Sequence, residues 1–111
     1  MVDGLQEISK KHDVQIPCYG HAGDGNIHVN IMLDKKNKEM LNRAKAAIED
    51  LFRKTVALGG TISGEHGIGI TKAPYLAMEL GSEEIALMKK IKIAFDPNGI
   101  LNPGKIFPEI K

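Results

Sequence analysis

Two histidines on either side of a glycine-rich turn are the first residues in this sequence that could carry out chemistry. They lie in the stretch Gly20-His21-Ala22-Gly23-Asp24-Gly25-Asn26-Ile27-His28-Val29-Asn30. A neutral imidazole offers a nitrogen lone pair, and two converging imidazoles can hold a divalent ion at about 2.0–2.1 Å. His21 and His28 are therefore candidate metal ligands. On these residues alone the alternative stays open, because many histidines are ordinary core or surface residues.

A second stretch supplies a carboxylate and a further imidazole. Glu65 and His66 lie among five glycines, Gly59, Gly60, Gly64, Gly67 and Gly69, and glycine lets the backbone approach a ligand closely. Glu65 could complete a two-histidine, one-carboxylate metal set that leaves positions open for a substrate. His66 could then act as a base, since histidine ordinarily titrates near neutral pH. The alternative is a flexible loop that carries a Glu-His pair by accident.

The elements that must position these residues start with an alternating pattern between residues 14 and 33. One set is Val14, Ile16 and Cys18, with Gln15, Pro17, Tyr19 and His21 pointing the other way; the next is Ile27, Val29, Ile31 and Leu33, opposite His28, Asn30 and Met32. A period of two is typical of strands, and the residues 22–26 suit a tight turn. The pattern predicts an antiparallel hairpin with His21 and His28 on its non-core face. Pro17 indicates an edge strand or an irregular start.

Helices are predicted around this hairpin. The expected segments are a short helix capped by Asp3 and ending near His12, a long helix from a cap at Asp34 or Asn37 to Gly59-Gly60, a short helix within Lys72–Leu80, and a helix capped by Ser82 that stops at Asp96-Pro97-Asn98-Gly99. Capping, dipole and turn preferences support these limits. The tail 101–105 is predicted to be irregular. His12 is expected to interact with its own helix end, and Cys18 to be a small core residue.

The composition limits the classes of protein to which the chain can belong. It has 111 residues, 42% hydrophobic and 26% charged, with a formal net charge of +1. These values predict one globular domain without a strong attraction to nucleic acid. Cys18 is the only cysteine, so an intrachain disulfide is impossible. No apolar run approaches the roughly 20 residues of a membrane span, and a soluble, cytoplasmic protein is expected.

Three blocks of the sequence together resemble a known family. They are Gly20-His21-Ala22-Gly23-Asp24-Gly25-Asn26-Ile27-His28, Gly64-Glu65-His66-Gly67-Ile68-Gly69 and Asp96-Pro97-Asn98-Gly99-Ile100-Leu101-Asn102-Pro103-Gly104-Lys105. In this order they are similar to the C-terminal region of FAD-linked oxidases of the vanillyl-alcohol oxidase superfamily. The resemblance is greatest to the branch that holds the glycolate oxidase catalytic subunit, D-lactate dehydrogenase and D-2-hydroxyglutarate dehydrogenase.

The resemblance implies roles for individual residues. Positions matching His21, His28 and Glu65 bind a divalent metal, commonly zinc, in metal-dependent members of this branch. Positions matching Asn30 and His66 face the substrate, and the position of His66 resembles the catalytic base. The position of Asn102 approaches the flavin. The implied reaction is oxidation of a 2-hydroxyacid to a 2-oxoacid by hydride transfer to FAD.

The resemblance also implies an architecture. Residues 1–111 are expected to be an α+β fragment of a ferredoxin-like substrate (cap) domain, with an antiparallel hairpin, helices and an irregular C-terminal tail. The N-terminal FAD-binding domain of the family would be absent, so the isolated chain is expected to be inactive. A homodimer, or association with a separate FAD-binding chain, should cover its exposed apolar surface. The alternative function is a stand-alone metal- or small-acid-binding module without redox activity.

Overall fold

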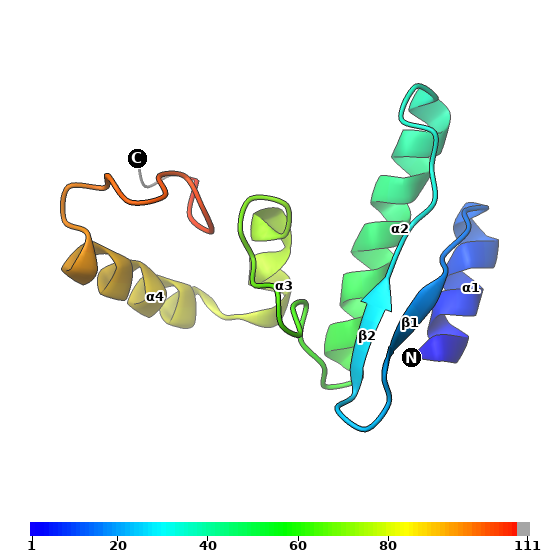
Figure 1. Cartoon of the computed structure of the whole chain (residues 1–111), viewed down its shortest axis with the longest axis horizontal. Helices are drawn as coiled ribbons and strands as arrows, with labels where there is room; N and C mark the ends of the chain where they lie inside the picture. The colour runs from blue at the N-terminus through cyan, green and yellow to red at the C-terminus, as the bar shows by residue number, and fades with distance from the viewer. Residues whose placement is uncertain (109–111) are drawn as a thin grey trace. The chain divides into compact units, whose positions relative to one another are not determined.

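The computed structural model describes residues 1–108, and the chain divides into two compact units, Met1–Gly60 and a second unit that begins at Thr61. The described residues form four α-helices, one short 3-10 helix and one two-stranded antiparallel sheet (Figure 1). The predicted α+β class is therefore confirmed. Each unit has its own buried residues.

Two helices and the hairpin make up the first unit. Helix α1 (Val2–His12) packs against α2 (Lys38–Ala57), and strands β1 (Cys18–His21) and β2 (Asn26–Val29) complete the unit. Its core consists of Leu5, Ile8, Val14, Ala47 and Leu51, with Ile16, Cys18, Val29 and Ile31 packed against it. The apolar strand faces therefore point to the helices, as the alternation predicts. Cys18 is partly buried here, in agreement with its predicted structural role.

The helix limits show which capping predictions were right. Asn37 caps α2, because its side-chain oxygen accepts a hydrogen bond from the Met40 amide at 3.2 Å. The predicted Asp3 cap is wrong: α1 begins at Val2 with Met1 before it, and Asp3 lies in the first turn. An acidic side chain still interacts favourably with the helix dipole from that position.

The strands are shorter than the alternating pattern predicts. Regular pairing ends at Val29, although an isolated pair joins Gln15 to Met32 further along. Between them the Asn30 amide donates to the Pro17 carbonyl at 3.0 Å. Pro17 has no N–H to donate in return, so it interrupts the ladder. The irregular position that Pro17 predicts is therefore confirmed.

The second unit is built from short elements. A 3-10 helix, η1 (Ala73–Tyr75), leads into α3 (Leu76–Glu79), and α4 (Ser82–Phe95) follows. Its buried hydrophobic residues are Ile62, Leu76 and Phe107. The predicted Ser82 cap is wrong by one position: Gly81 is the N-cap, and its amide donates to the Glu84 carboxylate at 3.1 Å. Across residues 1–108 no helix is long and apolar enough to cross a membrane.

Candidate functional site

The hairpin presents both candidate histidines on one face. The strand register places Tyr19 opposite His28 and His21 opposite Asn26. Residues directly opposite each other share a face, as do residues two apart on one strand. His21 and His28 therefore lie on the same face, while Cys18 and Val29 on the other face pack against the core. The predicted face is confirmed, and His21 is exposed while His28 is partly buried.

The hairpin that carries the two histidines depends on glycine at two positions, one in its turn and one in strand β1. Gly25 has a φ of 67°, in the left-handed region that glycine adopts readily. Gly20 has a different reason: a Cβ there would lie 2.1 Å from the Asn26 carbonyl oxygen and 2.9 Å from the Ile27 Cα. Only glycine allows the two strands to approach this closely. Sequence reasoning did not single out Gly20, although a glycine inside a strand was the available signal.

A ring stack accompanies His28 on this face. The centroids of the Tyr19 and His28 rings lie 4.9 Å apart with an interplanar angle of 17°, so the rings are stacked almost parallel. The sequence pattern predicts only that Tyr19 lies on the non-core face of a strand. Its pairing with His28 depends on the register, which the alternating pattern leaves undetermined.

The second pair of candidate residues lies in a loop of the second unit. The His66 Nε2 and the Glu65 Oε1 are 3.3 Å apart, and the two side chains are 76% and 51% exposed. The Ser63 hydroxyl accepts a hydrogen bond from the Gly67 amide at 2.7 Å, and Gly67 has a φ of 80°. The loop is thus held by a side-chain bond across Glu65 and His66, with a left-handed glycine after them. The glycines were the signal for a binding loop in the sequence, and the Ser63 contact was not predicted.

The C-terminal block is organised by a buried carboxylate. Asp96 is only 7% exposed; it accepts from the Lys92 ammonium at 2.6 Å and from the amides of Ile100 and Leu101 at 3.1 and 3.0 Å. The Lys92 hydrogen bond is the main reason why the pKa of Asp96 lies below its ordinary value, despite the opposing effect of burial. These bonds fix the backbone just before Asn102, an exposed residue with a φ of 46°. The turn was predicted, but not the role of this carboxylate.

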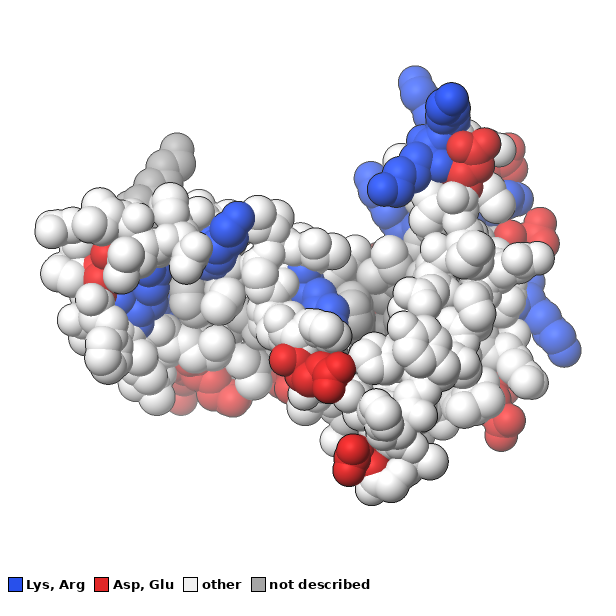
Figure 2. Space-filling view, viewed as in Figure 1, with Lys and Arg blue, Asp and Glu red and all other residues white. Residues whose placement is uncertain are grey.

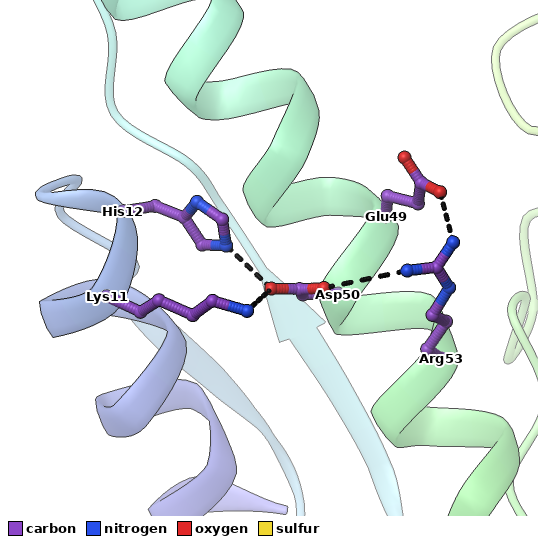
Figure 3. A network of polar contacts seen from close by, with 5 residues as sticks. All are labelled: Lys11, His12, Glu49, Asp50 and Arg53. Atoms are coloured by element: carbon purple, nitrogen blue, oxygen red, sulfur yellow. Dashed lines mark hydrogen bonds and ion pairs between the residues drawn. The ribbon is translucent and has the colours of Figure 1, made fainter.

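His12 has a partner that the sequence did not indicate. Its Nε2 lies 2.6 Å from the Asp50 Oδ2, which also accepts from the Lys11 ammonium at 2.8 Å (Figure 3). Arg53 lies 4.0 Å from the other Asp50 oxygen. Hydrogen bonds from Lys11 and then His12 lower the pKa of Asp50 to about 2. His12 thus joins the end of α1 to the middle of α2, and its role is structural.

Charges of both signs are distributed over the surface. Figure 2 shows basic side chains gathered where α2 begins, with acidic side chains beside them. The formal net charge of the chain is only +1. The surface in this view therefore offers no broad field of one sign.

All three sequence blocks lie within a domain that is characteristic of flavin-linked oxidases. The model for the FAD-linked oxidase C-terminal domain matches residues 1–106, so the chain belongs to this family. The chain is 50% identical over 107 residues to the glycolate oxidase subunit GlcD of Bacillus subtilis, covering 96% of this chain and 23% of that protein.

Other relatives carry related names. The mitochondrial D-lactate dehydrogenase [cytochrome] of Kluyveromyces lactis is 46% identical over 107 residues, which are 96% of this chain and 18% of that protein. The D-2-hydroxyglutarate dehydrogenase of Stutzerimonas stutzeri is 43% identical over 99 residues, 86% of this chain and 21% of that protein. The chain thus spans less than a quarter of the length of these relatives. The predicted family is confirmed.

Proposed function

We propose that the chain is the substrate- and metal-binding part of an FAD-dependent 2-hydroxyacid dehydrogenase, of the glycolate oxidase or D-lactate dehydrogenase type. The observation that carries this proposal is the hairpin face of His21 and His28 in a chain of the FAD-linked oxidase family. A ligand can approach the hairpin on the face turned away from the core, and both imidazoles lie on that face. The relatives named for glycolate, D-lactate and D-2-hydroxyglutarate indicate a 2-hydroxyacid as the class of substrate.

The donor atoms suit a divalent metal. Two imidazoles from the hairpin and the Glu65 carboxylate would form a set of nitrogen and oxygen ligands that zinc accepts. The two imidazoles belong to the first unit and the carboxylate to the second. When bound, the metal would withdraw electrons from the hydroxyl oxygen of the substrate and ease its deprotonation.

The side chains of this chain would then divide the work on the acid. Asn30 lies two residues after His28, just beyond the end of β2, and its side-chain amide would orient the substrate carboxylate. His66 would accept the hydroxyl proton at a ring nitrogen. The contact between Glu65 and His66 at 3.3 Å is compatible with both roles, because a carboxylate that binds a metal through one oxygen keeps the other for the imidazole.

FAD would be held outside the surface described here and would accept the hydride. Asn102 is the residue of this chain that we propose to lie near the flavin, on the backbone that Asp96 holds. Exposed apolar side chains support association with a flavin-binding polypeptide or a second copy. On α4 these are Leu87, Ile91, Ile93 and Phe95, and apolar surface of this kind is typical of interaction sites.

Zinc binding tests the proposal directly. Titration calorimetry of the metal-free chain should show about one zinc per chain, and His21→Ala and His28→Ala should each weaken binding at least about tenfold, the effect of removing a ligand. His12→Gln is the matched control, because it removes an imidazole that lies in the α1–α2 contact. Equal binding by all four proteins, or none by the wild type, would refute the metal site.

Turnover tests the redox part separately. The chain alone, given a 2-hydroxyacid, FAD and an artificial electron acceptor, should reduce no dye. Dye reduction should appear when a flavin-binding partner is added. Clear reduction by the chain alone would refute the proposal that FAD is bound by residues other than these. Zinc and acid binding without reduction in any combination would favour the stand-alone binding module.

A further inference from the structure

An exposed aromatic residue of the hairpin, Tyr19, stacks on the candidate ligand His28. Tyr19 is 64% exposed, and its ring lies almost parallel to that of His28 directly across the sheet. We infer that Tyr19 is a positioning residue: its ring holds the His28 imidazole in the orientation in which a nitrogen can bind a metal. This inference rests on the proposed function, in which His28 is a ligand.

The geometry of a stack suits a ligand better than most other contacts would. The lone pair of an imidazole nitrogen lies in the plane of the ring, so a metal must approach the edge of the ring and not its face. Rotation about the last side-chain bond of histidine has a broad minimum, and each rotation moves the lone pair. A nearly parallel partner at 4.9 Å covers the face and restricts that rotation. A stack occupies the face of the ring, whereas the lone pair of a nitrogen points from its edge.

Preorganisation of this kind sets the size of the expected effect. A ligand that is already oriented loses less side-chain freedom when the metal binds. The corresponding gain, from the strength of a ring pair, is about three- to tenfold in affinity. This is smaller than the effect of removing His28 itself. The stack involves the ring of Tyr19 and not its hydroxyl, so phenylalanine should replace tyrosine without loss of zinc affinity.

A purely structural role is the competing explanation, because cross-strand ring pairs also stabilise hairpins. Tyr19→Val separates the two roles: valine favours strands but cannot stack. Tyr19→Phe is the conservative variant that keeps the stack. For each protein, NMR would record the cross-strand contact between Cys18 and Val29, and the side-chain torsions of His28. Zinc affinity would be measured by competition with a chelator of known affinity.

The expected pattern differs from that of a structural role. Tyr19→Val should bind zinc three- to tenfold more weakly and show rotational averaging of the His28 ring, with the Cys18–Val29 contact intact. Tyr19→Phe should match the wild type within about twofold. The inference would be overturned if Tyr19→Val bound zinc as tightly as the wild type. It would also be overturned if Tyr19→Val bound zinc more weakly and had lost the Cys18–Val29 contact. Failure of the wild type to bind zinc would refute the proposed function instead, and a freely rotating His28 ring in the metal-free wild type would overturn the inference.

Discussion

Neutralising Asp50 should loosen the contact between the two helices of the first unit. In Asp50→Asn the carboxylate that receives both the Lys11 ammonium and the His12 ring is replaced by a neutral amide (Figure 3). The charge-assisted character of both hydrogen bonds is lost, although an amide oxygen can still accept one of them. The core beneath the contact, which includes Ala47 and Leu51, is left unchanged.

The pKa of Asp50 gives the size of the effect. It is lowered from 3.8 to about 2, mainly by the Lys11 and His12 hydrogen bonds, which corresponds to roughly 2 kcal/mol of stability. Because 23% of the side chain is exposed, solvent screening reduces this to about 1 kcal/mol. A carboxyl whose pKa is lower in the folded chain stabilises the fold fully above its unfolded value of 3.8. That stabilisation is lost as the pH falls through about 2.

Hydrogen exchange measured by NMR can follow the first unit separately from the second. At pH 6, amides of α2 that exchange through opening of the unit, such as that of Leu51, should exchange about fivefold faster in Asp50→Asn, as about 1 kcal/mol requires. Glu7→Gln, at an exposed position of α1, is the control and should change little. The difference between the wild type and Asp50→Asn should shrink below pH 4, be small at pH 2 and vanish below it. Equal exchange at pH 6, or a difference that persists unchanged at pH 2, would refute the reasoning.

Three further variants test other parts of the chain. Gly20→Ala places a Cβ 2.1 Å from the Asn26 oxygen and should destabilise the hairpin by about 1–3 kcal/mol, with loss of cross-strand NMR contacts. Gly23→Ala is the control and should fold normally, because its added Cβ meets nothing within 4 Å. Equal stability of the two variants would contradict the strand geometry. Asp96→Asn should remove the protection of the Ile100 and Leu101 amides against hydrogen exchange. In the wild type this protection should persist above the ordinary carboxyl pKa and disappear as the pH falls through the lowered pKa of Asp96. Unchanged protection in the variant would contradict this role of Asp96. In an enzyme reconstituted with a flavin-binding partner, His66→Gln should slow flavin reduction by about 100-fold or more while zinc affinity stays the same; unchanged reduction in stopped-flow measurements would exclude His66 as the base.

The face of the two histidines could be predicted from the sequence because side-chain alternation in a strand is a local geometric rule. The core face is identified by Val14, Ile16 and Cys18 from their alternation alone, without knowledge of the rest of the fold. The shortening of the strands could be anticipated only in part, through Pro17. The sequence favours Asp3 and Ser82 as helix caps, whereas the caps are Met1 and Gly81. Neighbouring residues compete for the start of a helix, and the sequence alone does not decide between positions one or two apart.

Contacts between distant residues were not predictable in the same way. Lys11 and His12 lie 39 and 38 positions from Asp50. In the sequence Lys11 resembles an ordinary solvent-facing residue, and His12 resembles a partner of its own helix end. Asp96 resembled a turn residue, and its burial depends on how the tail folds back on Lys92. The Tyr19–His28 stack could be predicted only with the register of the two strands, and a shift of one residue in the pairing would separate the two rings. Local patterns thus revealed the candidate ligands, whereas their supporting contacts needed the fold.

The distribution of the donors between two units makes the number of ligands testable. The hairpin brings together His21 and His28 without any residue of the second unit, so two imidazoles could hold zinc weakly by themselves. In that case Glu65→Gln would leave the affinity unchanged, and only the histidine variants would weaken it. If Glu65 is a ligand, Glu65→Gln should weaken zinc binding to an extent comparable with His21→Ala. Addition of zinc should then change the NMR spectra of both Gly20 and Gly67, one from each unit, instead of the hairpin alone.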